Sequence, residues 1–182
     1  MNTLCYRGIP VIGFAAYSGV GKTTVLKNLI PLLNNDGIHA GVVKHTHHKF
    51  DIDHPGKDSY ELRKSGATQI VVGSKYRRAM IMETPEPAGE PQLIEFLTHV
   101  NTNAIDVILV EGFRHVDYPK IEINREMDSE LLFKSDETII ALISDREDIA
   151  DLSIPRLDVN DSPALANFIR DYMQAALSNL KA

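Results

Sequence analysis

Cysteine is almost absent from this chain of 182 residues, which contains only Cys5. A single cysteine cannot form an intrachain disulfide, and without a Cys-x-x-Cys pair the chain lacks the usual frame of a structural zinc site. Such cysteine usage suits a protein that functions in a reducing cytosol. The chain is long enough for its stability to come from a buried core instead.

Long apolar runs are missing as well. The first residues, MNTLCYRGIPVIGFAAYSG, contain no stretch long enough to span a membrane, and Arg7 alone is too little positive charge for a signal peptide. We therefore expect a cytoplasmic protein without a membrane segment. With 43% hydrophobic and 24% charged residues, the sequence predicts one globular domain over residues 1–182, with a short irregular N-terminus at 1–8.

Aromatic residues make up only 7% of the chain and the net charge is −6, a combination that argues against nucleic-acid binding. The charge is unevenly distributed. Residues 44–78 carry eight Lys or Arg, four Asp or Glu and four His, a local net charge of +4. A basic segment in an acidic protein indicates a localised anion site, although a solvated charged face explains the same composition equally well.

Apolar periodicity predicts strands that alternate with helices. Residues 9–16 form a short apolar run typical of a buried strand, and Val25, Leu26 and Leu29 recur as one face of a helix over 22–34. Further strands are expected at 38–43, 68–72, 79–82, 105–110, 121–124 and 138–143, and further helices at 59–64, 92–100 and 162–177. This order predicts an α/β fold with a mostly parallel sheet flanked by helices. The strands at 68–72 and 79–82 are expected to form a hairpin.

Residues 16–23, AYSGVGKT, match the phosphate-binding loop at every position except the first, where Ala16 replaces a glycine. Gly19 and Gly21 allow backbone N–H groups to approach phosphate oxygens closely. Lys22 would bring a cation to the β- and γ-phosphates, and the Thr23 hydroxyl is suited to Mg²⁺. Because the first position mainly serves the turn out of the strand, alanine is tolerated there. The sequence predicts binding of a nucleoside triphosphate.

A phosphate loop needs a carboxylate at the end of a neighbouring strand to hold the Mg²⁺ shell. Glu111 follows the strand at 105–110 directly, and Gly112 after it allows close approach. We favour Glu111 over Asp106, which begins the same strand. Most such proteins have aspartate at this strand end, so we expect Glu111 to act through a metal-bound water.

The polar segment at 44–57 allows two interpretations. If the segment is a transition-metal site, the ligands would come from His45, His47, His48, Asp51, Asp53 and His54. As a switch loop, it would bring Asp53 toward Mg²⁺, while Lys44, His45 and Lys57 would contact phosphate. The lack of cysteines and of a helical histidine pair favours the switch loop. Plain exposure to solvent is the commonest outcome for any one of these histidines.

Three segments, in this order and spacing, resemble the molybdopterin-guanine dinucleotide biosynthesis adaptor (MobB) family: FAAYSGVGKTT, VVKHTHHKFDIDHPGKDSYELRKSGA and DVILVEGFRH. The resemblance covers residues 9–159. It implies a phosphate-loop NTPase fold with an extra strand pair that builds a homodimer. It also implies a GTP-binding protein with weak GTPase activity that assists the molybdenum cofactor guanylyltransferase, which joins GMP to molybdopterin.

The resemblance implies roles for particular residues. Lys22, Asp53 and Glu111 would form the catalytic group, with Thr23, Asp53 and Glu111 on the Mg²⁺ side. The phosphates of GTP would be held by Ser18, Gly19, Val20, Gly21, Lys22, Thr23 and Thr24. Basic residues of the central segment would face an anion, such as the phosphate of molybdopterin. The chain has no Asn-Lys-x-Asp motif for guanine; Asp145 is the nearest candidate, and an aspartate that caps a turn is an equal alternative.

Two other functions could use the same loop. A small-molecule or nucleotide kinase needs an acceptor pocket and usually an arginine-bearing lid, whereas the basic residues at 75–78 are typical of a hairpin turn. A metal-insertion GTPase would use the histidine cluster, but the missing cysteines and guanine motif count against it. Arg77, Arg78 and Arg114 are the candidates for an arginine that stabilises phosphoryl charge.

Overall fold

The structure, a computed structural model, describes residues 2–46, 49–84, 89–127, 129–149 and 152–181. Contacts within the chain define two compact units. The first unit comprises Met1–His45 and Gln92–Ala182, and the second comprises Thr46–Pro91. Among the described residues, no helix is long and apolar enough to cross a membrane.

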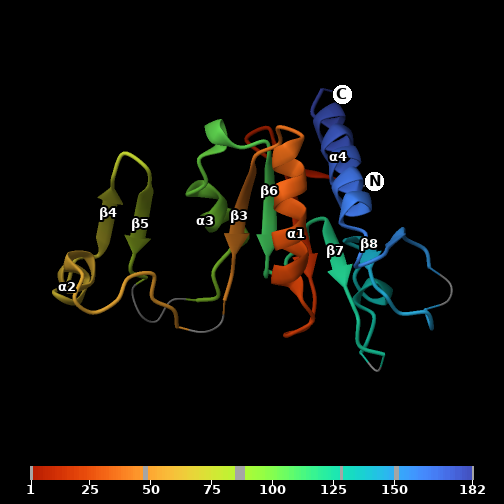
Figure 1. The fold of residues 1–182 in the computed structure, drawn as a ribbon, viewed down its shortest axis with the longest axis horizontal. Coiled ribbons are helices and arrows are strands. Elements are labelled where there is room, and N and C mark those ends of the chain that lie inside the picture. The colour runs from red at the N-terminus through yellow and green to blue at the C-terminus, as the bar shows by residue number, and fades with distance from the viewer. Residues whose placement is uncertain (1, 47–48, 85–88, 128, 150–151, 182) are drawn as a thin grey trace. The chain divides into compact units, whose positions relative to one another are not determined.

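The first unit is built on a seven-stranded sheet (Figure 1). Its main path runs through β3 (Ala40–Lys44), β6 (Val107–Glu111), β2 (Ile9–Ala15), β7 (Lys120–Ile123), β8 (Ile139–Ile143) and β9 (Arg156–Leu157). All neighbours on this path are parallel. The seventh strand, β1 (Leu4–Tyr6), pairs antiparallel with the start of β2. The predicted α/β fold with a mostly parallel sheet is confirmed.

Helices cover both faces of this sheet, which explains why its central strands are continuously apolar. On one face, Val107 and Leu109 of β6 share a buried cluster with residues of α1 (Lys22–Asn35) and α4 (Ser162–Asn179), which lie side by side in Figure 1. On the other face, Ile108 and Val110 pack in a second cluster with α3 (Leu93–Thr98). The alternation along one strand thus supplies two separate cores.

Parallel strands bring their carboxyl ends to one edge of the sheet, where α/β folds usually bind ligands. The register places Phe14, near the end of β2, opposite Glu111 at the end of β6. On the other side of β2, Ala15 pairs with Glu122 of β7. The phosphate loop therefore leaves the sheet between the ends of β6 and β7.

The second unit contains α2 (Asp58–Lys64) and the strands β4 (Gln69–Gly73) and β5 (Arg78–Met82). The two strands pair antiparallel through five residue pairs and form a separate sheet. The predicted hairpin and the additional strand pair are confirmed.

Several elements differ from the sequence prediction. Strand β1 lies within residues 1–8, where an irregular N-terminus was expected; the backbone N–H of Leu4 donates to the Tyr172 hydroxyl of α4, a long-range contact without a local sequence signal. Helix α1 continues through Pro31 to Asn35, because Leu29 and Leu33 on either side of the proline are fully buried. Strand β9 and the two short 3₁₀ helices, η1 (Thr102–Ala104) and η2 (Leu132–Lys134), were not anticipated.

Candidate functional site

The phosphate-binding loop joins β2 to α1 in the first unit. Gly19 and Gly21 have φ angles of 85° and 102°, a backbone conformation that residues with a Cβ rarely adopt. Among the described non-glycine residues, only Arg7 and Phe113 have positive φ, so Ala16 has a backbone conformation that alanine tolerates. The loop therefore has glycine where the backbone requires it and alanine where it does not.

Helix α1 begins without a side-chain cap. Its N-cap residue is Gly21, and its first turn contains no acidic side chain. The first N–H groups of a helix need acceptors from outside the helix and attract negative charge. Thr23 and Thr24 are exposed in the same turn. The start of α1 can therefore offer several donors to an anion.

The Lys22 side chain folds back over the loop. Its Nζ donates to the carbonyl oxygens of Ala16 at 3.1 Å and Tyr17 at 2.9 Å. Burial lowers the pKa of Lys22; Glu111 opposes this shift, and the charges of Lys44 and Arg114 add to it. The charges of Lys44 and Arg114 thus act on Lys22 together with the carboxylate of Glu111, an arrangement suited to binding phosphate.

Glu111 lies at the end of β6, in register with Phe14 of β2 and Lys44 of β3. Its side chain is 11% exposed, and its Oε1 lies 3.2 Å from Nζ of Lys44. Asp106 precedes the same strand and accepts a hydrogen bond from the backbone N–H of His39 at 2.8 Å. The structure therefore places Glu111, and not Asp106, on the edge of the sheet from which the phosphate loop leaves.

His45 packs against the segment that follows β6. Its ring stacks on Phe113 with centroids 4.7 Å apart, and its backbone N–H donates to the carbonyl of Glu111. A Cβ on Gly112 would lie 2.8 Å from Cβ of His45, so the close approach of these two segments requires glycine. The phosphate contact of His45 stays a prediction.

Asp53 and Lys57 belong to the second unit. Arg63 of α2 donates through Nη2 to Oδ1 of Asp53 at 2.7 Å, and its other carboxylate partners are Asp51 and Glu83. The second oxygen of Asp53, Oδ2, is buried and has no hydrogen-bond partner in the described part of the chain. Lys57 is exposed and precedes α2 as its N-cap residue.

Asp145 follows β8 and forms an ion pair with Arg125, which lies beyond the end of β7. Nε and Nη2 of Arg125 donate to Oδ2 of Asp145 at 3.1 and 2.8 Å. The hydrogen bond from Arg125 lowers the pKa of Asp145. Asp145 is therefore an ionised acceptor close to the sheet edge, which is the chemistry that guanine N–H donors need.

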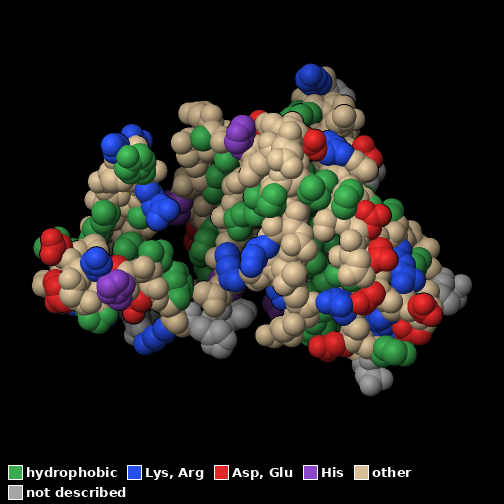
Figure 2. All heavy atoms as spheres, in the orientation of Figure 1, with side chains coloured by type: hydrophobic (Ala, Val, Ile, Leu, Met, Phe, Trp, Pro, Cys, Tyr) green, Lys and Arg blue, Asp and Glu red, His purple; other side chains and the backbone are tan. Residues whose placement is uncertain are grey.

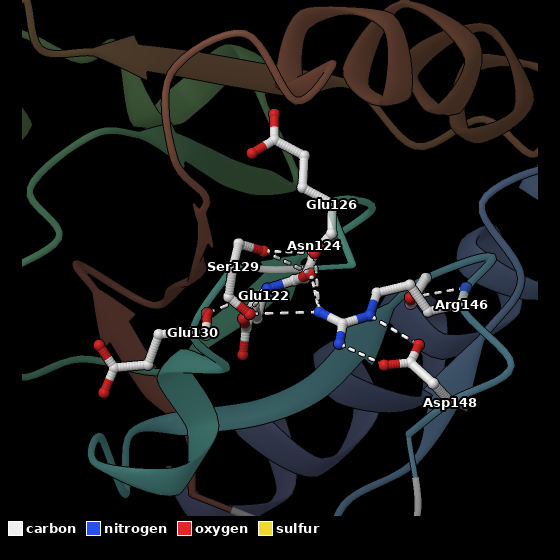
Figure 3. Close-up of polar contacts among 8 residues, drawn as sticks. Glu122, Asn124, Glu126, Ser129, Glu130, Arg146 and Asp148 are labelled. Carbon is white, nitrogen blue, oxygen red and sulfur yellow. Dashed lines mark hydrogen bonds and ion pairs between the residues drawn. The ribbon is translucent and has the colours of Figure 1, made fainter.

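A buried polar network joins the segments that follow β7 and β8 (Figure 3). Nη1 of Arg146 donates to Oδ1 of Asn124 at 2.9 Å and to the backbone carbonyls of Glu126 and Ser129. Its Nε and Nη2 form a bidentate pair with Asp148 at 3.0 and 2.7 Å. Because Arg125 and Asp145 adjoin Asn124 and Arg146 in the sequence, this network fixes the backbone that carries their ion pair.

Sequence reasoning missed the charged residues inside β7. Lys120 and Glu122 are 1% and 0% exposed. Glu122 accepts hydrogen bonds from the backbone N–H groups of Leu132 and Phe133 at 3.0 and 2.9 Å. The available signal was a strand in which charged residues alternate with isoleucines. That pattern usually indicates one solvent-exposed face, but here both faces are covered.

The interpretation of the histidine cluster as a metal site finds no support among the described residues. Among them, no group of three or more His, Cys, Asp or Glu side chains could hold a metal ion. His47 and His48, which belonged to that cluster, lie outside the described residues.

The parallel sheet, with a glycine-rich loop between its central strand and a helix, defines a protein with a phosphate-loop NTPase-like fold. Solved structures agree. A MobB protein homolog from Bacillus stearothermophilus matches with a TM-score of 0.70 and 19% identity, covering 91% of this chain and 98% of that chain. A crystal structure of Bacillus subtilis MobB matches with the same TM-score and identity, covering 90% and 98%. At this level of identity the likeness shows the fold alone.

Sequence comparison shows the family. The family model of molybdopterin guanine dinucleotide synthesis protein B (MobB) matches residues 11–145. The molybdopterin-guanine dinucleotide biosynthesis adapter protein of Escherichia coli (strain K12) is 46% identical over 172 residues, covering 91% of this chain and 94% of that protein. The protein of the same name from Haemophilus influenzae is 35% identical over 165 residues, covering 91% and 90%. The chain belongs to the MobB family, as the resemblance of its motifs predicted.

Proposed function

We propose that this protein binds GTP with Mg²⁺, hydrolyses it slowly, and acts as an adaptor for the enzyme that joins GMP to molybdopterin. The phosphate loop carries the proposal: Gly19 and Gly21 have the positive φ angles that the loop needs, the Lys22 side chain lies over the loop, and the helix that follows begins without a side-chain cap. Membership of the MobB family connects the chain with molybdopterin guanine dinucleotide synthesis. The similarity to two adapter proteins supports the adaptor role.

The donor set around the loop fits a nucleotide with Mg²⁺. Ser18, Gly19, Val20 and the first turn of α1 would hold the phosphates, with Lys22 at the β- and γ-phosphates. Thr23 and Glu111 offer the hydroxyl and carboxylate oxygens that Mg²⁺ prefers, and a role of Asp53 on the Mg²⁺ side stays a prediction from the family resemblance. When bound, Mg²⁺ would neutralise phosphate charge.

The base would be recognised at the neighbouring strand ends. Guanine presents N–H donors that an ionised carboxylate accepts, and Asp145 is ionised beside Arg125. Asp145 would therefore recognise guanine in place of the missing Asn-Lys-x-Asp motif.

We assign the basic segment 44–78 to an anionic ligand such as the phosphate of molybdopterin, because it combines a local charge of +4 with a net charge of −6 for the whole chain. We also assign the strand pair β4–β5 to homodimer formation. Val71, Met80 and Met82, on one face of this hairpin, are 69%, 41% and 49% exposed. Figure 2 shows hydrophobic side chains on the surface of these strands.

Titration calorimetry of GTP, GDP and ATP with Mg²⁺, with a parallel assay of phosphate release, tests the proposal. We expect preference for guanine nucleotides and slow release. Lys22→Ala should weaken GTP binding by at least about 100-fold, since it removes a charge-assisted contact to phosphate. The control is Lys27→Ala, an equal loss of charge on an exposed position of the same helix. Full GTP affinity in Lys22→Ala would refute the site. Preference for ATP, with no release until a small acceptor is added, would identify a kinase.

A further inference from the structure

Arg114, in the segment that follows β6, lies beside the phosphate loop. The guanidinium carbon of Arg114 lies 5.4 Å from the centroid of the Tyr17 ring, within the range of a cation–π contact. The carbonyl of Tyr17 also accepts a hydrogen bond from Nζ of Lys22. The guanidinium of Arg114 and the ammonium of Lys22 therefore both contact the same residue of the loop, and the charge of Arg114 acts on Lys22.

Arg114 has no carboxylate partner among the described residues, although its side chain is half-buried. Arg63 and Arg146, whose side chains are 8% and 7% exposed, each bind carboxylates. A guanidinium over an aromatic face keeps its in-plane N–H donors available for an anion. An arginine beside a phosphate loop, without a carboxylate partner among the described residues, is suited to a phosphate oxygen.

The backbone around Arg114 is fixed by its neighbours. Gly112 and Phe113 have φ angles of 102° and 52°, and Phe113 is held in this unusual conformation by stacking with His45 and by an edge contact with Phe96. Backbone strain of this kind persists where the surrounding structure enforces it, and it is concentrated at functional sites. The hydroxyl of Tyr118 donates to the carbonyl of Gly112 at 2.9 Å, which holds the start of the same turn.

A buried ammonium fixes Arg114 directly. Nζ of Lys120, 1% exposed, donates to the carbonyl of Arg114 at 3.3 Å and to that of Val116 at 2.7 Å. Lys120 belongs to β7, which pairs with β2, the strand that leads into the phosphate loop. The position of Arg114 relative to the loop is therefore set by the sheet itself.

We propose that Arg114 binds the terminal phosphate of the nucleoside triphosphate, and so distinguishes the triphosphate from the diphosphate. This inference rests on the proposed function. Lys22 addresses the β- and γ-phosphates, and Arg114 reaches the loop from the end of β6, the side on which Glu111 lies. A cation at that place contacts the end of the phosphate chain, away from the base-binding side at β7 and β8.

The test compares binding of a non-hydrolysable GTP analogue and of GDP, both with Mg²⁺, by titration calorimetry. Arg114→Ala should lower the affinity for the analogue by about tenfold and the affinity for GDP by less than about twofold. Arg114→Lys keeps the charge and loses the planar fork of the guanidinium. Its affinity for the analogue should lie between that of Arg114→Ala and that of the unaltered protein. Arg7→Ala is the matched control, because Arg7 lies over Tyr6 at 5.3 Å, a pair of the same kind away from the loop.

Equal weakening of both nucleotides, or of neither, in a folded Arg114→Ala variant would overturn the inference and leave the proposed function intact. Failure of the unaltered protein to bind either nucleotide would overturn both. Circular dichroism and thermal melting of each variant verify folding, and Arg114→Lys keeps the test valid if the alanine variant is unstable.

Discussion

At the scale of single residues, two glycines with the same φ angle allow the cost of backbone strain to be separated from the cost of close packing. Gly21 and Gly112 both have φ of 102°. A Cβ on Gly21 would meet no atom within 4 Å, whereas a Cβ on Gly112 would lie 2.8 Å from Cβ of His45. The first position therefore tests strain alone, and the second tests strain together with close packing.

We expect Gly21→Ala to lower the free energy of unfolding by about 1 kcal/mol, the cost of a positive φ for alanine. Gly112→Ala should lower it by about 3 kcal/mol, because overpacking adds to the strain. Gly21→Ala should also weaken GTP binding despite its smaller effect on stability. Urea denaturation measures the first quantity and calorimetry the second. Equal losses of stability in the two variants would contradict the close contact with His45.

At the scale of elements, an ion pair between the buried Lys120 and the partly exposed Asp136 connects β7 to the segment before β8. Nζ of Lys120 lies 3.1 Å from Oδ2 of Asp136, and the hydroxyl and backbone N–H of Thr138 both donate to Oδ1 of Asp136. Removing one partner of such a pair leaves the other charge without compensation, a larger loss than the pair's own net contribution. The remaining carbonyl acceptors of Lys120 moderate the loss.

Asp136→Asn should therefore lower the free energy of unfolding by about 2 kcal/mol at neutral pH. The control is Asp36→Asn, which removes an exposed pair with Arg170 and should cost less than about 1 kcal/mol. Urea denaturation of both variants provides the measurement. Similar losses of unfolding free energy in the two variants would show that the buried Lys120 does not depend on Asp136 more than an exposed cation depends on its partner.

The same pair predicts a pH dependence. Burial raises the pKa of Asp136, but hydrogen bonds from Thr138 and Lys120 outweigh burial and leave the pKa below its ordinary value. A carboxyl whose pKa is lowered by folding contributes stability above its unfolded pKa of about 4 and loses it as pH falls through the folded value. The difference in unfolding free energy between the unaltered protein and Asp136→Asn should be constant at neutral pH and shrink below pH about 4. A difference that grows toward acid pH would contradict this sign.

The same elements show what the sequence could predict. The position of the loop between β2 and α1, the position of Glu111 at the end of β6, and the strands β2, β6 and β8 depend on contiguous residues, so local patterns were sufficient to predict them. The burial of Lys120 and Glu122 depends on carbonyl and N–H groups from segments that are not local, and the pairing of Arg114 with Tyr17 joins residues far apart in the chain. Such contacts are set by the order of strands in the sheet, which periodicity does not give.

At the scale of the whole molecule, the second unit has a sheet of only two described strands, β4 and β5. Strands β4 and β5 pair only with each other among the described residues. A two-stranded sheet is marginally stable in water, and exposed strand edges favour pairing with another chain. Val71 and Met80 lie opposite each other in the register and are both exposed. A second copy of the chain would cover these side chains and supply the missing strands.

We expect Val71→Glu to raise the dimer dissociation constant by about 100-fold, or ~3 kcal/mol, because dimerisation would bury an unpaired charge. Ile94→Glu on α3 is the matched control, since Ile94 is 55% exposed and lies in the first unit. Size-exclusion chromatography with light scattering, over a range of concentrations, measures the oligomeric state. A dimer that tolerates Val71→Glu but is broken by Ile94→Glu would move the interface to the first unit. A monomer at all concentrations in the unaltered protein would remove the hairpin's assigned role and leave GTP binding to be judged on its own.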